Sequence, residues 1–185
     1  DVMTTETTCL SSIWKTDDTI KEFYEIHGRA GAYKELKPGP VAYYDGMIRI
    51  DLGKQESMIA LPFHPSNAYT IHELQADPEK ILREVEADAK KRFGDKVEID
   101  LVGKIRDGKV MADQGIIAGC SGGTFDNICA AADILRGRSC GNGAFTLSVY
   151  PGSMPALAEL MKNGRAHDLI AAGVILRECF CGPCF

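Results

Sequence analysis

The chain has no excess of basic residues. Its 21 Lys and Arg residues are outnumbered by 26 Asp and Glu residues, which gives a formal net charge of -5. Basic residues cluster only briefly, in Lys90-Lys91-Arg92 and Arg136-Gly137-Arg138. Proteins that bind nucleic acid usually carry a basic surface, so we expect no nucleic-acid partner.

Long apolar runs are also absent. No stretch approaches the length needed to span a bilayer, and the first residues lack the pattern of a signal peptide, so we expect no membrane partner. The sequence also has no Walker-type glycine loop, no Ser-His-Asp order and no paired carboxylates in an apolar setting. These absences disfavour P-loop enzymes, serine hydrolases and carboxylate-pair enzymes.

The seven cysteines are scattered over 185 residues rather than concentrated in a small disulfide-rich domain. With 45% hydrophobic residues, the chain can build a core without disulfides. We therefore expect a cytoplasmic protein in which some cysteines serve as ligands. None of the four histidines stands at a metal-ligand spacing from a cysteine, so thiols are the candidate donors.

The first part of the chain is expected to be a linking region. Thr16-Asp17-Asp18 predicts the N-cap and acidic first turn of a helix that runs to about Ile26, and alternating apolar residues predict a half-buried strand over Tyr44 to Leu52. Residues 53–76 contain the chain-breaking Pro62, Pro65 and Asn67 and are interpreted as an irregular connector. We therefore predict an N-terminal segment and connector over residues 1–76 and a compact domain over residues 77–185.

The second part of the chain alternates between strands and helices. A helix is predicted after the N-cap Asp77, and an Asp107-Gly108 turn indicates a hairpin. The expected strands are 97–102, 109–111, 114–119, 145–150 and 174–176, and the further expected helices are 124–135, 155–161 and 166–172. This order predicts an α/β fold with a largely parallel sheet and right-handed crossovers.

Three cysteines follow strands of this predicted sheet. Cys120 lies in the Gly119-Cys120-Ser121-Gly122-Gly123 turn, and Cys181 and Cys184 form a Cys-Gly-Pro-Cys motif after the last strand. The carboxyl ends of parallel strands share one edge of a sheet, so we expect the three thiols to converge there. Small residues allow close backbone approach around Cys120, and a following helix start favours its thiolate form.

A Cys-x-x-Cys pair is compatible with several kinds of site. It can hold an iron-sulfur cluster, hold zinc, or act as a thiol-redox pair. A zinc site would need a fourth ligand, such as Cys179 or a histidine. A redox pair normally begins a helix inside the fold, whereas this pair lies at the end of the chain, which disfavours that alternative.

Three motifs occur in one order: Ile116-Ile117-Ala118-Gly119-Cys120-Ser121, Val149-Tyr150-Pro151-Gly152-Ser153 and Cys181-Gly182-Pro183-Cys184. Together they resemble the third domain of the aconitase family of iron-sulfur hydro-lyases. Four upstream segments resemble the end of the preceding domain and its connector, so that the likeness covers essentially the whole chain. These segments are Met3-Thr4-Thr5, His27-Gly28-Arg29, Ile48-Arg49-Ile50-Asp51-Leu52 and Leu61-Pro62-Phe63-His64-Pro65.

The resemblance implies a three-layer αβα domain whose Cys120, Cys181 and Cys184 ligate a [4Fe-4S] cluster. The iron without a protein ligand would act as a Lewis acid in the reversible dehydration and hydration of a small hydroxy-polycarboxylic acid. The family's serine base and carboxylate-binding arginines lie in other domains, so no catalytic residue is assigned within this chain. We expect the chain to be a piece of a longer protein, to be inactive alone and to lose its cluster in air.

The sequence departs from the family pattern beside the predicted cluster. Ser121-Gly122 stands where the family usually has Thr-Asn, and Glu178-Cys179-Phe180 stands where aconitases proper tend to have Ala-Asn-Ala. Such neighbours can alter substrate choice and the hydrogen bonds around a metal. The resemblance therefore favours a divergent aconitase-like hydratase over aconitase itself.

Overall fold

The computed structural model describes residues 8–182, and these residues divide into two compact units. The first unit ends at Asp51 and the second begins at Leu52. None of the helices within residues 8–182 is both long and apolar enough to cross a membrane.

The first unit is built around helix α1, Asp18–Ile26, and a short 3₁₀ helix, Ala30–Ala32. The side chain of Asp17 accepts a hydrogen bond from the backbone N–H of Ile20, which confirms the predicted N-cap. The ring of Tyr24 contacts that of Tyr33, with ring centroids 6.3 Å apart. These contacts hold α1 against the turn that follows it.

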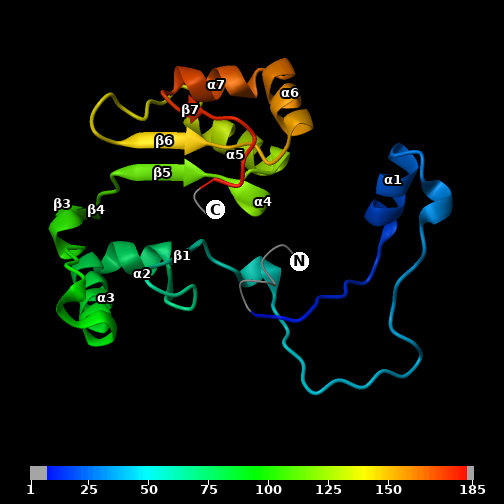
Figure 1. Ribbon diagram of the computed structural model, residues 1–185, viewed down its shortest axis with the longest axis horizontal. Coiled ribbons are helices and arrows are strands. Elements are labelled where there is room, and N and C mark those ends of the chain that lie inside the picture. The colour runs from blue at the N-terminus through cyan, green and yellow to red at the C-terminus, as the bar shows by residue number, and fades with distance from the viewer. Residues whose placement is uncertain (1–7, 183–185) are drawn as a thin grey trace. The chain divides into compact units, whose positions relative to one another are not determined.

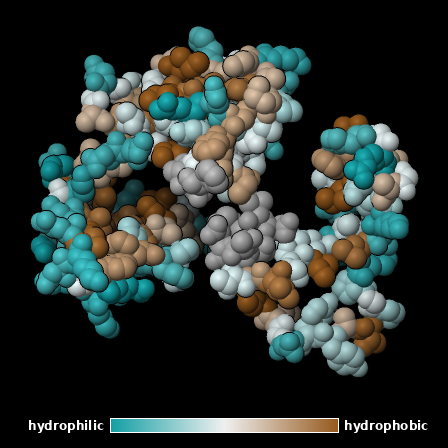
Figure 2. Space-filling view, in the orientation of Figure 1, coloured by the Kyte–Doolittle hydropathy of each residue, from teal (hydrophilic) through white to brown (hydrophobic). Residues whose placement is uncertain are grey.

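The strand predicted over Tyr44 to Leu52 is wrong, because the structure has irregular backbone there and a 3₁₀ helix at Leu52–Lys54. A strand needs a partner for its backbone hydrogen bonds, and none of the described strands pairs with this segment. Met47 and Ile48 are consequently 88% and 89% exposed. Figure 2 shows apolar residues, in brown, at the surface of this part of the chain.

Residues 53–76 are not an irregular connector. They form an antiparallel hairpin of β1, Met58–Ala60, and β2, Ala68–Thr70, followed by helix α2, Ile71–Ala76. The hydroxyl of Thr70 accepts from the backbone N–H of Glu73, and the Glu73 carboxylate accepts from the backbone N–H of Thr70. The bonds from Thr70 lower the pKa of Glu73, so this capping box weakens as the pH falls through that pKa.

Helix α3, Pro78–Phe93, follows the N-cap Asp77 and buries Ile81, Leu82, Val85 and Ala89, whereas Phe93 at its end is 39% exposed. Together with α2 and the hairpin it forms one of two buried clusters in the second unit. The buried members of this cluster are Leu61, Leu74, Ile81, Leu82 and Val85. The domain boundary expected at residue 77 stays a prediction. In the structure, side chains from residues 58–76 pack against α3.

The strand predicted at 97–102 is wrong, for a reason that lies in α3. The Glu86 carboxylate accepts hydrogen bonds from the backbone N–H groups of Leu101, at 2.6 Å, and Val102, at 2.8 Å. Since these donors are bound to a helix side chain, they do not enter a sheet. The segment instead lies between two 3₁₀ turns, Gly94–Lys96 before it and Val102–Lys104 at its end. The hairpin predicted at Asp107-Gly108 is confirmed, with β3 at Ile105–Arg106 and β4 at Lys109–Val110.

The predicted parallel sheet is confirmed, and its strands lie in the order β5-β6-β7 (Figure 1). Strand β5 is Gln114–Ile117, β6 is Thr146–Val149 and β7 is Ile175–Leu176. The connecting helices are α4, Gly119–Gly122, α5, Phe125–Leu135, α6, Met154–Lys162, and α7, Arg165–Ala171. This alternation gives the α/β fold predicted from the sequence.

Helices α5, α6 and α7 pack on one face of this sheet. Their buried residues form a cluster with Val149, against which Ile117 and Leu176 of the neighbouring strands also pack. Ile116 and Ile175 project to the opposite face, where each remains 38% exposed and belongs to neither buried cluster. Within residues 8–182 the helices thus cover one face, and the second helix layer of an αβα arrangement stays a prediction.

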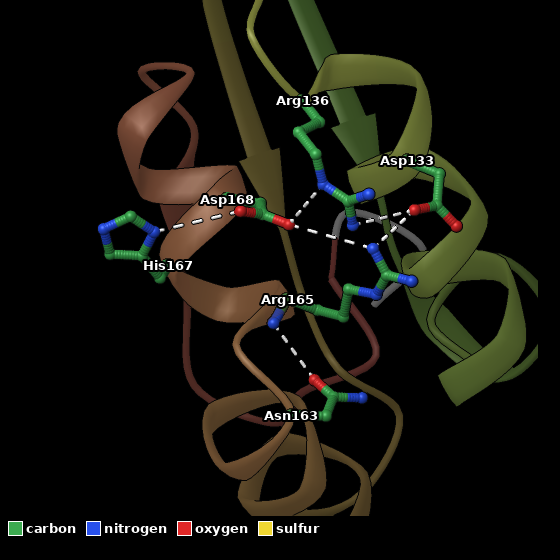
Figure 3. A network of polar contacts seen from close by, with 6 residues as sticks. All are labelled: Asp133, Arg136, Asn163, Arg165, His167 and Asp168. Carbon is green, nitrogen blue, oxygen red and sulfur yellow. Dashed lines mark hydrogen bonds and ion pairs between the residues drawn. The ribbon is translucent and has the colours of Figure 1, made fainter.

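A network of charges joins α5 to α7 across this helix layer (Figure 3). Arg136 donates to Asp168 at 3.0 Å and lies 2.9 Å from Asp133, while Arg165 donates to Asp133 as well. The side chains of Arg165 and Asp168 are only about a quarter exposed, at 25% and 24%. A partly buried network of this kind stabilises more than isolated surface pairs do.

We predict that Asp133→Asn loosens the packing of α7 in the full-length protein, because two arginines then share one carboxylate. Amide hydrogen exchange in α7 should become about fivefold faster at low salt, which corresponds to about 1 kcal/mol for a network member. The difference should shrink at 1 M salt. Glu159→Gln is the control, since it removes one exposed pair with Lys162 at 3.4 Å. Equal effects of the two substitutions would contradict a special role for the network.

Candidate functional site

The candidate site lies where the three parallel strands end. Cys120 follows β5 and lies within the four-residue helix α4, and Cys181 lies in the segment that follows β7. Cys120 and Cys181 are both exposed. Cys184, the third predicted ligand, lies outside the described residues.

The structure brings the Cys120 and Cys181 segments into backbone contact. A methyl group built on Gly119 would lie 3.2 Å from the carbonyl oxygen of Cys181. One built on Gly182 would lie 2.8 Å from the Cβ atom of Ala118. Gly119 and Gly182 also have φ values of +78° and +85°, which favour glycine. Glycine therefore permits the approach that the parallel topology predicts.

The turn after β6 completes the same edge. The backbone N–H of Gly152 donates to the carbonyl of Gly123 at 2.8 Å, and that of Tyr150 donates to the carbonyl of Ile117, also at 2.8 Å. Pro151 is fully buried, and the Ser153 hydroxyl caps helix α6 by accepting from the backbone N–H of Ala156. The predicted Pro-Gly-Ser turn is thus hydrogen-bonded to the Cys120 turn through Gly152 and Gly123.

Gly123 is the most tightly packed glycine of this edge. A methyl group there would lie 2.5 Å from the carbonyl oxygen of Tyr150, 2.7 Å from that of Gly119 and 3.1 Å from the nitrogen of Gly152. All three neighbours are backbone atoms, which have no alternative rotamers. The sequence contained a signal for this contact, namely the second of two consecutive glycines after Cys120, but not its geometry.

Sequence reasoning missed one polar residue that contacts the turn. The side-chain Nδ2 of Asn127, in the first turn of α5, donates to the carbonyl oxygen of Ser121 at 2.7 Å. Ser121 directly follows Cys120, so this bond holds the backbone beside the predicted ligand. A side chain that reaches back six residues leaves no periodic pattern, and the sequence alone gave no reason to single it out.

The donor chemistry of this edge fits an iron-sulfur cluster with three thiolate ligands. Two exposed thiols come from segments that contact each other, and the third predicted thiol follows Cys181 by three residues. Within residues 8–182, no group of three His, Cys, Asp or Glu side chains lies close enough to hold a metal ion. The ligand roles of the three cysteines, and that of Cys179 in the zinc alternative, stay predictions.

Two known dehydratase large subunits are similar to this chain over nearly its whole length. The chain is 28% identical over 174 residues to the 2,3-dimethylmalate dehydratase large subunit of Eubacterium barkeri, a match covering 94% of this chain and 33% of that protein. It is 23% identical over 185 residues to the 3-isopropylmalate dehydratase large subunit of Clostridioides difficile (strain 630), covering 98% of this chain and 36% of that protein.

The chain thus spans about a third of the length of the curated relatives it matches. A family model described as the aconitase family, aconitate hydratase, matches residues 1–185. The matched range includes the Cys120 turn, the Pro151-Gly152 turn and the Cys181 segment, which meet at one edge of the sheet. The chain therefore belongs to the aconitase family.

Proposed function

We propose that the protein containing this chain is a hydro-lyase that reversibly removes water from a small hydroxy-polycarboxylic acid. In this proposal Cys120, Cys181 and Cys184 hold a [4Fe-4S] cluster. The observation that carries it is the backbone contact between Gly119 and the Cys181 carbonyl at the carboxyl edge of a parallel sheet. Ligands of open α/β sheets usually bind at this edge.

The names of the relatives support the substrate class. Both 2,3-dimethylmalate dehydratase and 3-isopropylmalate dehydratase are named for the loss of water from a substituted malate, which is a hydroxy-dicarboxylic acid. We infer that the substrate here is also a compact hydroxy acid with at least two carboxylates. The unusual neighbours Ser121-Gly122 and Glu178-Cys179-Phe180 would then adjust the choice among such acids.

The chain's own residues would hold and orient the cofactor. When bound, the cluster supplies a Lewis acid for the loss and addition of water without net redox change. Gly119 and Gly182 allow the two ligand segments to approach each other. Gly123 allows the turn after β6 to approach the Cys120 turn, and Asn127 fixes the backbone after Cys120. The group that removes the proton and the groups that bind carboxylates would come from other parts of the protein.

The proposal includes partners beyond the substrate. The relatives are named large subunits, so we infer that the whole protein works with a further, smaller subunit as well as with its own remaining domains. The isolated chain should be inactive, because it contains the cluster ligands without the catalytic base. An oxygen-sensitive cluster and seven thiols suit the reducing cytoplasm, where we place the protein.

The test is an assay of the full-length protein with its partner subunit after anaerobic reconstitution with iron and sulfide. We expect substituted malates and related hydroxy-tricarboxylates to be dehydrated to unsaturated acids, followed by ultraviolet absorbance, with no consumption of a redox cofactor. The isolated chain, treated identically, should show no turnover. A reconstituted protein that dehydrates none of these acids, or one that binds stoichiometric zinc in place of a cluster, would overturn the proposal.

A further inference from the structure

We propose that Asn127 is a positioning residue that holds the Cys120 turn in its ligand-binding conformation. The identity of that ligand as an iron-sulfur cluster rests on the proposed function, whereas the positioning itself rests on geometry. Asn127 is the third residue of α5, and its Nδ2 donates to the Ser121 carbonyl at 2.7 Å. Ser121 is joined to Cys120 by a peptide bond.

The Ser121 carbonyl lies at a helix end that needs a donor. Helix α4 has only four residues, and the last carbonyls of any helix lack partners within it. The chain bends at Gly123 before α5 begins, and the N-cap of α5, Thr124, makes no side-chain capping bond. Asn127 therefore links α4 to α5 across this bend. Only the amide nitrogen can donate to a carbonyl, which fixes the orientation of the side chain.

Cys120 is consequently held from both sides. On one side, Gly119 contacts the carbonyl of Cys181 and accepts a hydrogen bond from the N–H of Gly123 at 3.1 Å. On the other side, the carbonyl of Ser121 is held by Asn127. A metal ligand whose backbone is fixed in this way binds with less loss of conformational freedom, as supporting shells of metal sites do generally.

The helix itself gains nothing from an asparagine at this position. Asparagine has a lower helix propensity than alanine, so Asn127→Ala should leave α5 as stable or more stable. Any loosening of the Cys120 turn in that variant would therefore come from the lost hydrogen bond. Asn127→Asp is the sharper change, because it keeps the size of the side chain and replaces the donor by a carboxylate oxygen that repels the Ser121 carbonyl.

The experiment measures amide hydrogen exchange over residues 119–124 in the metal-free, full-length protein. We expect exchange there to be about fivefold faster in Asn127→Ala, the effect of one lost hydrogen bond, and faster still in Asn127→Asp. Ala130→Gly is the control, since Ala130 is exposed on the same helix and the change weakens α5 without touching the bond to Ser121. It should leave exchange over residues 119–124 unchanged.

A second readout follows the cofactor. In reconstituted protein, transfer of iron to a chelator should proceed at the parent rate in Ala130→Gly, faster in Asn127→Ala and fastest in Asn127→Asp. Unchanged exchange in both Asn127 variants, or an equal rise in Ala130→Gly, would overturn the positioning role. If exchange rises as expected but no variant, including the parent protein, takes up a cluster, then the proposed function fails while the role of Asn127 in holding the turn stands.

Discussion

Gly123→Ala should disrupt the edge of the sheet on which the candidate site is built. The new methyl group would lie 2.5 Å and 2.7 Å from the carbonyl oxygens of Tyr150 and Gly119, and neither backbone atom can turn aside. We expect the free energy of unfolding to fall by about 2 kcal/mol or more, as for overpacked cores. Gly152 would lose its bond to Gly123, and the Cys120 turn would move away from the turn that follows β6.

The neighbouring glycine provides a matched control. A methyl group on Gly122 meets only Ile117 Cγ2, at the ordinary contact distance of 3.9 Å. Neither glycine has a positive φ. Gly123 has φ -84° and ψ 9°, which alanine also adopts. The two substitutions therefore differ only in the room available to the new methyl group. Denaturant unfolding of the metal-free full-length protein should show a large loss for Gly123→Ala and almost none for Gly122→Ala. Similar losses would refute the close approach of the two turns.

Cys120→Ser should abolish the dehydratase activity proposed for the full-length protein. A serine hydroxyl is a poor replacement for a thiolate ligand, so the cluster would be lost or held loosely. Lewis-acid catalysis contributes several kcal/mol, and we therefore expect kcat to fall by about 10³-fold or more. The fold should be unaffected, because Cys120 is exposed and contributes to neither buried cluster.

Cys179→Ser distinguishes a cluster from the zinc alternative. Cys179 stands two residues before Cys181 and is the cysteine that a four-thiolate zinc site would recruit. Because the proposed cluster takes its three thiolate ligands from other cysteines, Cys179→Ser should keep most of the activity, measured in the same assay as Cys120→Ser. A loss as large as that of Cys120→Ser would mean that Cys179 is itself a ligand.

The parallel sheet could be predicted because its signals are local. Strands and helices alternate from Gln114 to Leu176, and the structure follows this order closely. The adjacency of Cys120 and Cys181 also follows from topology, since both come after parallel strands. The roles of Gly123 and Asn127 could not be predicted, because they depend on distances between backbone atoms of different turns.

The predicted strands that are wrong failed for physical reasons outside their own residues. The segment at 97–102 is apolar enough for a strand, but Glu86 takes up two of its backbone donors. Ile48 and Ile50 alternate with polar residues as in a strand, yet within residues 8–182 no neighbouring strand pairs with them. Pairing is a property of two segments, and a pattern in one of them does not supply the other.

The proposed function depends on one iron-sulfur cluster held by Cys120, Cys181 and Cys184. The most direct test is the iron, sulfide and zinc content of the full-length protein after anaerobic purification, compared with the three single Cys→Ser variants and Cys179→Ser. We predict about four irons and about four sulfides per chain, little zinc, and loss of iron in each of the three variants but not in Cys179→Ser. One tightly bound zinc per chain, or a cluster that survives in each of the three single variants, would contradict the assignment of these cysteines as cluster ligands.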